Sequence, residues 1–353
     1  MIRLALLALV PIAPLLHYAL GLAPIWVFLS GILGVGVLAD WVRAATEQLA
    51  KHTGPAVGGL LTISLGSLAE LMLALFVVAQ GEAEVVHAQI TGSIIGTSLL
   101  GLGLAIVAGG VSRERQTFKR ERAGLLSTLL FLAVIALLLP AIFDFTERSV
   151  VRADNVRVSD EALSLVVSGV LLLLYAANLI YTLVTHRDVF ATEAEHADAP
   201  AWSLLLCLGV LIAATLGAAL ESELISAALT EAASTLHLSP IFLGVIVLAL
   251  VGTVSDLFSA VWFARQDRMG LVMSICIGSA IQVALVVAPL LVILSWLIGS
   301  PMTLVFKDPL DLFAITATVF IVNVITSDGE TTWFEGVLLI GVYVVMGMAF
   351  FFA

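Results

Sequence analysis

Two short stretches decide the architecture of this chain: Gly66-Ser67-Leu68-Ala69-Glu70 and Gly252-Thr253-Val254-Ser255-Asp256. Each places an acid four residues after a glycine, inside a long apolar run. The second stretch follows the first at an offset of 186 residues, and the same offset relates Gly92-Ser93 to Gly278-Ser279. A charged side chain at the centre of a bilayer costs about 2.5–3.5 kcal/mol on insertion scales. Two acids at equivalent places therefore favour a role in an ion pathway.

The composition is typical of a helical membrane protein. Of the 353 residues, 61% are hydrophobic, and the mean hydropathy is +1.15, whereas soluble domains are roughly 45–50% apolar. Apolar runs recur that are long enough to cross a hydrocarbon core of about 30 Å. Runs such as 163–174 do not alternate apolar with polar residues, which excludes a barrel. We expect an all-α polytopic fold.

The remaining composition excludes several classes of partner. The net charge of −11 lies mostly in loops, and no basic run suggests nucleic acid. The sequence carries no cofactor fingerprint. Cys207 and Cys276 stand alone in apolar runs, so they do not define a redox compartment. The expected partners are inorganic cations, protons and the lipid bilayer, and the oligomeric state stays open.

Eleven spans are predicted from the apolar runs and the polar breaks between them. The first run resembles a signal peptide, but Pro11, Pro14 and His17 lead into no clear small-residue cleavage site, so it is interpreted as a span. In chain order the spans cover approximately residues 2–20, 24–48, 56–80, 86–109, 122–142, 159–186, 202–230, 239–264, 270–298, 310–326 and 333–352.

The positively charged residues predict the orientation, because cytoplasmic loops carry an excess of Lys and Arg. With alternating spans, the side of the N-terminus carries ten of these residues and the other side carries four. The N-terminus is therefore predicted to be cytoplasmic and the C-terminus to lie outside. The ten are Arg3, Lys51, Arg113, Arg115, Lys119, Arg120, Arg122, Arg187, Arg265 and Arg268; the four are Arg148, Arg152, Arg157 and Lys307; Arg43 falls within a span.

The offset of 186 residues has a topological consequence. It maps the third span onto the eighth and the fourth onto the ninth, so each repeat is five helices long. Because five is odd, the second copy enters the membrane from the opposite side, which makes an inverted repeat. We expect a first transmembrane helix at 1–22, a first five-helix repeat at 23–187, an acidic cytoplasmic linker at 188–200 and a second five-helix repeat at 201–353.

The residue types of the repeated motif suit a hard cation. Glu70 and Asp256 supply carboxylates, while glycine allows close approach and frees backbone carbonyls to face a cavity. An oxygen-rich centre without Cys or His is typical of Ca²⁺. When the ion leaves, two neighbouring acids in low dielectric take up protons, so the pattern predicts proton-coupled antiport. The predicted metal ligands are Glu70, Asp256, Gly66, Gly252, Ser67 and Thr253.

Other polar residues are candidates for the path of protons and cations. Ser93 and Ser279 begin the facing helices, and Gln282 lies one turn beyond Gly278. Small residues such as Gly92 and Ser93 also commonly serve only to pack helices, and that alternative stays open. The polar residues Asp40, Arg43, Glu47 and Lys51 recur at steps of three and four, so Glu47 belongs either to the path or to an ion-pair ladder. Glu223, and less strongly Glu221, are candidates on the seventh span.

Residues 59–71, which read Gly-Leu-Leu-Thr-Ile-Ser-Leu-Gly-Ser-Leu-Ala-Glu-Leu, resemble the first repeat of cation/proton exchangers, the CAX branch of the Ca²⁺/cation antiporter superfamily. The resemblance covers nearly the whole chain in order. It implies a Ca²⁺/H⁺ antiporter, with Glu70 and Asp256 as central ion-binding acids and with Glu47 and Glu223 on the proton and cation path. Further similar blocks are 45–49, 91–96, 222–225, 278–282, 327–329 and 333–336.

The motif departs from the family pattern, which is Gly-Asn-Ala-x-Glu in both repeats and often has His after the second acid. Ser67 and Thr253 replace the two Asn residues, Asp256 replaces Glu, and Leu257 stands where His is frequent. Ser, Thr and Asp are shared with the Na⁺/Ca²⁺ exchanger branch, but that branch has a Pro before the acid and one more residue of spacing. The altered oxygens leave the selected cation open.

Three alternatives remain at this point. The same scaffold permits exchange of Na⁺, K⁺ or Mn²⁺ for protons. An intramembrane enzyme would need a motif such as HExxH or GxGD, and neither occurs. A channel would pass ions without stoichiometric proton movement. The expected location is a bacterial plasma (inner) membrane, with an organelle membrane as the other possibility.

Overall fold

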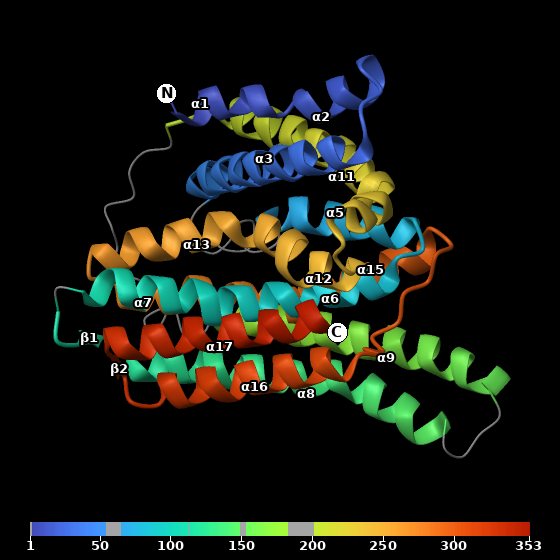
Figure 1. Ribbon diagram of the computed structural model, residues 1–353. Coiled ribbons are helices and arrows are strands. Elements are labelled where there is room, and N and C mark those ends of the chain that lie inside the picture. The colour runs from blue at the N-terminus through green and yellow to red at the C-terminus, as the bar shows by residue number, and fades with distance from the viewer. Residues whose placement is uncertain (1, 54–64, 112, 149–152, 183–200) are drawn as a thin grey trace. The chain divides into compact units, whose positions relative to one another are not determined.

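The computed structural model describes residues 2–53, 65–111, 113–148, 153–182 and 201–353, and nearly all of them are helical. Figure 1 shows the arrangement of the helices along the chain. The described part contains one small sheet, in which β1 (Gln116–Thr117) pairs antiparallel with β2 (Glu330–Thr331). The all-α fold class predicted from composition is confirmed.

The first half of the chain forms α1 (Ile2–Leu6), η1 (Leu7–Leu9), α2 (Ile12–Pro14), η2 (Leu15–Ala19), α3 (Pro24–Thr53), α5 (Leu68–Ala79), α6 (Ala83–Ile95), η3 (Gly96–Gly101), α7 (Leu102–Gly110), α8 (Arg120–Arg148) and α9 (Ala153–Ile180). Those of the second half are α11 (Leu204–Leu236), α12 (Pro240–Phe242), η5 (Leu243–Leu248), α13 (Ala249–Arg265), α14 (Met269–Gln282), η6 (Val283–Val287), α15 (Ala288–Leu297), α16 (Pro309–Thr326) and α17 (Trp333–Phe352).

The eleven predicted spans correspond to helices of the described part. Nine of its helices are long and apolar enough to cross a bilayer, and two shorter apolar helices, Leu4–Ala19 and Leu68–Ala79, complete the set. The start of the predicted span 56–80 and the predicted linker 188–200 lie outside the described residues. The chain is therefore an integral, multi-pass membrane protein.

Local helix geometry repeats at the same offset as the sequence. Adding 186 to the first residue of α6 gives Met269, the first residue of α14. Both helices continue into a π-helical segment, η3 or η6, and adding 186 to the last residue of η3 gives the last residue of η6. The next helices, α7 and α15, also begin at matching positions. The fourth and ninth spans thus share the order and boundaries of their helical segments as well as positions in the sequence.

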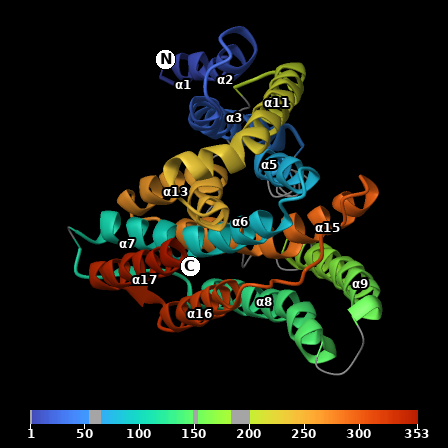
Figure 2. The ribbon, with the colours of Figure 1, turned by 45° about the vertical axis from the view of Figure 1, so that its right-hand side comes forward.

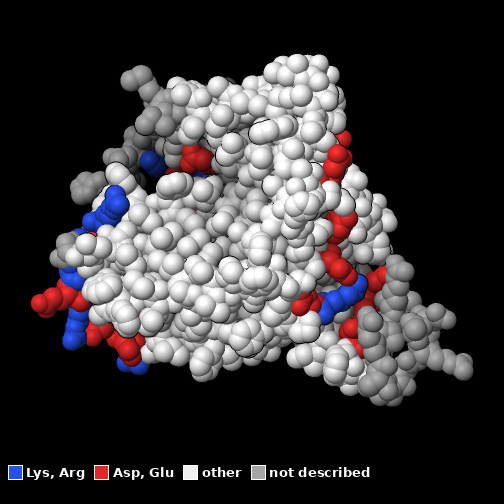
Figure 3. Space-filling model, viewed as in Figure 1, with Lys and Arg blue, Asp and Glu red and all other residues white. Residues whose placement is uncertain are grey.

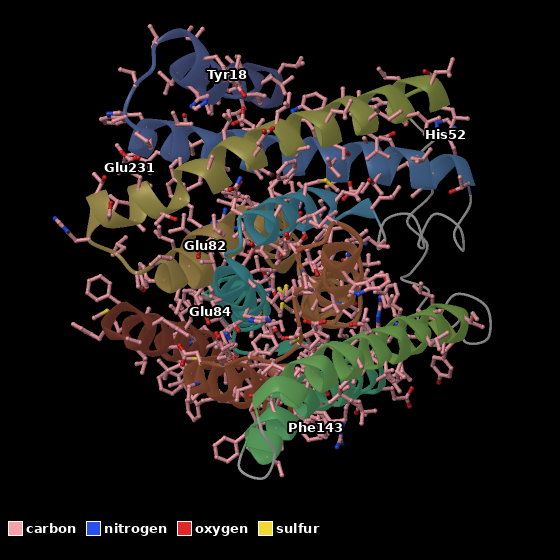
Figure 4. All side chains as sticks on the ribbon, turned by 90° about the vertical axis from the view of Figure 1, so that its right-hand side faces the viewer. Tyr18, His52, Glu82, Glu84, Phe143 and Glu231 are labelled. Atoms are coloured by element: carbon pink, nitrogen blue, oxygen red, sulfur yellow. The ribbon has the colours of Figure 1, made fainter. Side chains whose placement is uncertain are left out.

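One compact unit comprises residues Met1–Glu82 and Ala176–Leu243. Its centre is the pair α3 and α11, which run antiparallel: Gly31 lies against Ile225, Gly217 lies against Leu38, and His52 Nε2 lies 2.7 Å from the Trp202 carbonyl oxygen. Figure 4 labels His52 and Glu231 at opposite ends of this pair. Because α3 and α11 are the second and seventh spans, their opposite directions are those of an inverted repeat.

The other compact unit comprises Ala83–Tyr175 and Gly244–Ala353. Within it α7 packs on α17, α16 packs on α8, and α13 packs along α6, η3 and α7; Figure 2 shows the first two of these pairs. At the crossing of α6 with η5, a Cβ on Gly92 would overlap the Val245 carbonyl oxygen. Glycine is required there because the two backbones touch.

The contacts between loops agree with the alternation of eleven spans. In the second unit the β1–β2 pair and the Arg113–Asp267 ion pair of 3.5 Å join loops on the predicted cytoplasmic side. The 3.0 Å Lys307–Glu84 ion pair joins loops on the opposite side. Figure 3 shows charged side chains gathered toward helix ends, with a broad uncharged surface between them, as lipid contact requires.

The predicted repeats and the compact units divide the chain differently. Each unit takes helices from both halves of the sequence, because α11 joins α3 and α5 in one unit while α13 to α17 join α6 to α8 in the other. The repeat boundaries at 23–187 and 201–353 therefore remain a prediction about sequence, and the units describe packing in space.

Candidate functional site

The first motif lies at a break in a helix. Leu65 is helical, Gly66 and Ser67 form a turn, and α5 starts at Leu68, which places Glu70 in the first turn of α5. The Leu71 backbone nitrogen donates to the Ser67 carbonyl at 2.9 Å and so closes the first turn. The amide groups and dipole at a helix start favour negative charge. The backbone of this motif therefore supports the carboxylate that the sequence puts there.

Glu70 is buried, with 5% of its surface exposed. The neighbouring Ala69 belongs to an apolar cluster of α3, α5 and α11 that includes Leu38, Val42 and Leu211. A carboxylate with so little exposed surface has few water ligands, so a cation or a proton that reaches it is bound in a medium of low dielectric constant. These are the conditions that the predicted exchange needs.

The second motif has the same spacing but a different backbone. α13 runs without a break through Gly252 and Thr253, and it is preceded one turn earlier by the π-helical segment η5. Asp256 lies in the middle of α13 and is half-buried. Thr253 is 1% exposed, and its hydroxyl donates to the Ala249 carbonyl at 2.9 Å. π-helical segments often occur at functional sites because they widen the helix and shift its carbonyls.

The two predicted serines also differ. Ser93 is fully buried in α6, where the Thr97 hydroxyl donates to the Ser93 carbonyl at 2.8 Å. Ser279 and Gln282 are half-buried near the end of α14, and each serine stands shortly before a π-helical segment. All three residues are therefore in positions where a polar side chain is at least partly withdrawn from solvent.

The second compact unit brings several of these residues onto packed helices. α13 carries Thr253 and Asp256. It packs along α6, which carries Ser93, and along η3, which directly follows α6. The Thr253 hydroxyl is 4.0 Å from the place that a Cβ on Gly96 would occupy. Glu70 belongs to the other unit, so the joint binding of an ion by Glu70 and Asp256 remains a prediction.

The predicted path residues Glu47 and Glu223 are exposed. Glu47 accepts a 3.0 Å hydrogen bond from Arg43 Nε one turn earlier, which is the ion-pair contact that the spacing on α3 also allowed. Glu221 is instead 1% exposed and faces Gly31 and Gly34 of α3. Roles for Glu47 and Glu223 in the path remain predictions.

Gln89 is a candidate that the sequence analysis did not single out. It lies one turn before Ser93 on α6, is 1% exposed, and neither its amide nitrogen nor its amide oxygen has a hydrogen-bond partner among the described residues. Its counterpart at the offset of 186 is Ile275, so a search for repeated residues passes over it. The sequence offered one indication of this candidate, a single amide side chain in an apolar run, four residues before Ser93.

A repeated acidic motif and a helix that breaks just before a buried acid are typical of secondary transporters. The model of the family described as sodium/calcium exchanger protein matches residues 23–184 and 206–352. The chain belongs to this family.

Individual relatives match over almost the full length of the chain. A Ca²⁺/H⁺ antiporter of Synechocystis sp. is 38% identical and matches over 99% of this chain and 97% of its own length. The Ca²⁺/H⁺ antiporter ChaA of Bacillus subtilis is 36% identical over 89% of this chain and 88% of its own. The solved structure of native YfkE covers 100% of both chains with 31% identity and a TM-score of 0.85. The crystal structure of the H⁺/Ca²⁺ exchanger CAX, at 17% identity, covers 97% of this chain and 86% of its own with a TM-score of 0.74, and it supports the fold alone.

Proposed function

We propose that this protein is a secondary active transporter that exchanges Ca²⁺ for H⁺ across a membrane by alternating access. The observation that carries the proposal is the similarity, at 36–38% identity over most of the chain, to relatives named as Ca²⁺/H⁺ antiporters. The buried acid at the start of α5 and its counterpart on α13 supply the chemistry that such an exchange requires.

In this mechanism Glu70 and Asp256 bind either the cation or protons. Two carboxylates balance a divalent charge, and hydroxyls of Ser67 and Thr253 with carbonyls near Gly66 and Gly252 add oxygen ligands. After release of the cation, two like charges close together in low dielectric raise the proton affinity of the acids. The same groups then return loaded with protons, so one movement cannot proceed without the other.

The proposed location is a bacterial plasma membrane with the N-terminus in the cytoplasm. Relatives from Synechocystis and Bacillus subtilis support a bacterial setting, and the ten-to-four distribution of Lys and Arg supports the orientation. If the cytoplasm is less acidic than the exterior, inward proton movement drives efflux of the cation.

A second candidate function is exchange of Na⁺, K⁺ or Mn²⁺ for protons. The specific observation is the set of substitutions in the motif, since Ser67 and Thr253 replace amide side chains and Asp256 is shorter than Glu. A change in the length and type of oxygen ligands alters the cavity size and therefore the ion that fits best.

The test is reconstitution of the purified protein into acid-loaded vesicles that contain a pH dye. External Ca²⁺ is expected to make the lumen more alkaline, more strongly than Mn²⁺, Na⁺ or K⁺ added one at a time. A larger response to another cation would replace Ca²⁺ as the substrate, and Ca²⁺ entry without proton movement would indicate a channel. Vesicles with the Glu70→Gln variant serve as the control for leakage.

A further inference from the structure

One buried glycine of the second unit lies beside room that no described side chain fills. Gly96 is the first residue of η3 and is buried. A Cβ added to Gly96 would have no atom of the described part of the chain nearer than the Thr253 hydroxyl oxygen, at 4.0 Å. By contrast, a Cβ on Gly92 or Gly109 of the same span would strike a backbone carbonyl oxygen of η5 or α13. Packing therefore requires glycine at 92 and 109 but not at 96.

The fourth and eighth spans touch on both sides of this room. Gly92 meets the Val245 carbonyl oxygen of η5, and Gly109 meets the Ala264 carbonyl oxygen of α13. Between these two points α13 packs along η3 and α7, and Figure 1 shows α13 lying along α7. Because the backbones are already in contact at both points, the two spans cannot close the room between them by moving together. We call the space beside Gly96, between η3 and α13, the Gly96 gap.

Polar side chains border the Gly96 gap. Thr253 is 1% exposed, and its hydroxyl donates within its own helix at 2.9 Å, which leaves oxygen lone pairs that can bind a cation. Asp256 follows one turn later on α13. On α6, Ser93 lies one turn before Gly96 and Gln89 lies two turns before it, so the two side chains belong to the same side of the helix. The gap thus lies between oxygen-bearing residues of both spans.

The second repeat carries a side chain where the first carries none. Gln282 is the counterpart of Gly96 at the offset of 186 residues, and it is half-buried at the end of α14. Ser67 and Thr253 are in turn shorter than the Asn residues of the family pattern. Room of this kind affects selectivity, because Ca²⁺ takes about six to eight oxygen ligands at about 2.3–2.6 Å, whereas Mg²⁺ demands octahedral ligands at about 2.0–2.1 Å. Mn²⁺ is also typical of octahedral oxygen sites.

We propose that Gly96 is a specificity-determining residue that selects large divalent cations. The inference rests on the proposed Ca²⁺/H⁺ exchange and concerns the cation that the second motif binds. With no side chain at 96, a cation held by Thr253 and Asp256 keeps room in the Gly96 gap for a further oxygen ligand such as water. A methyl group at 96 takes that room and favours an ion that needs fewer ligands. Ca²⁺ and the larger Sr²⁺ are therefore preferred over Mn²⁺.

The test measures proton movement driven by Ca²⁺, Sr²⁺ or Mn²⁺ in vesicles that contain the reconstituted protein. In Gly96→Ala the concentration for half-maximal exchange is expected to rise about tenfold for Ca²⁺ and at least as much for Sr²⁺, because one added methyl group displaces a ligand. For Mn²⁺ it is expected to stay within about twofold of the wild type. The ratio of the Mn²⁺ value to the Ca²⁺ value therefore falls. A loss of folded protein would lower the rates for all three ions together and would not change this ratio.

Two matched variants test the cause of the change. Gly96→Ser adds nearly the same volume as Gly96→Ala but brings a hydroxyl, so its Ca²⁺ affinity is expected to lie closer to that of the wild type. Gly124→Ala, in α8 of the same unit, is the control, because a Cβ there also has no described atom within 4 Å. It is expected to leave the ion preference unchanged. Both alanine variants are expected to fold, since Ala favours a helix more than Gly does.

The inference would be overturned if folded Gly96→Ala protein lost activity equally for the three ions or kept the wild-type ratio. An equal loss of Ca²⁺ affinity in Gly96→Ser and Gly96→Ala would also overturn it, because the hydroxyl would then supply nothing to the ion. The wild type alone decides the proposed function: a wild type that responds to none of the three ions would contradict the exchange itself. An unchanged ratio in Gly96→Ala beside an active wild type would contradict the inference and leave the proposed function standing.

Discussion

The two copies of the acidic motif share their spacing but not their backbone. In the first, the helix breaks at Gly66–Ser67 and Glu70 is buried in the first turn of α5. In the second, α13 is continuous and Asp256 is half-buried in mid-helix. A helix start favours a carboxylate through its free amide groups, whereas a mid-helix position gives no such support. Inverted repeats therefore do not have to be in the same conformation, and a difference between copies is what alternating access requires.

The largest expected effect tests whether both copies are needed. Glu70→Gln and Asp256→Asn should each reduce Ca²⁺-driven proton movement to the level of protein-free vesicles, because an amide carries no charge for the cation and no proton to exchange. The measurement is the pH-dye assay on reconstituted protein, with thermal unfolding of each variant as the control. Full activity in either variant would remove that acid from the proposed site.

Changing the length of each acid in a separate variant should show whether the two copies of the motif differ in function. Glu70→Asp shortens a buried side chain by one methylene, so its carboxylate moves away from the proposed ligand position. The Ca²⁺ concentration for half-maximal exchange should rise about tenfold, which corresponds to about 1.4 kcal/mol. Asp256→Glu extends a half-buried side chain that can adjust, and about threefold is expected. Titration of Ca²⁺ in the vesicle assay checks both values, and equal shifts would contradict a functional difference between the copies.

Two glycines at corresponding positions of the repeats should differ in how much their substitution lowers the stability of the protein. A Cβ on Gly92 would overlap the Val245 carbonyl, whereas a Cβ on its counterpart Gly278 would have no atom of the described structure within 4 Å. Gly92→Ala should lower the free energy of unfolding by about 1–3 kcal/mol or more, while Gly278→Ala should change it by less than about 0.5 kcal/mol. Thermal unfolding in detergent measures both, and similar melting temperatures would show that α6 and η5 are less closely packed than described.

The smallest effect is expected at Glu47, which has Ala233 at the corresponding place in the second copy. Its ion pair with Arg43 is on a surface where Glu47 is 50% exposed, and such pairs contribute about 0–1 kcal/mol. Glu47→Gln should leave the melting temperature nearly unchanged. A loss of exchange in that folded variant would support the predicted role of Glu47 in the path. Full exchange would indicate that Glu47 serves only in the ion pair with Arg43.

The sequence was sufficient for the features that depend on hydropathy and repetition. Eleven apolar runs predicted the helices to within a few residues at most ends, and the paired Gly-Ser stretches at 92 and 278 predicted copies whose π-helical segments also correspond. These features follow from local composition and from an ungapped offset, so they can be deduced without knowledge of packing.

Features that depend on packing could not be deduced in this way. Whether Glu221 or Glu223 enters the α3–α11 interface depends on helix rotation, and the structure buries Glu221. Gly96 and Thr253 lie in different repeats, so only the fold brings them together. The break before Glu70 was equally hidden, because its counterpart on α13 is an unbroken helix with almost the same sequence pattern.

The packing of α3 with α11 bears on the symmetry of the fold. Gly31 and Gly217 are counterparts at the offset of 186, and each lies against a large aliphatic residue of the other helix, Ile225 or Leu38. The exchange is exact to within one position, because the counterpart of Ile225 is Ala39. A pseudo-two-fold axis between the two helices accounts for such an exchange, as expected for repeats of opposite orientation.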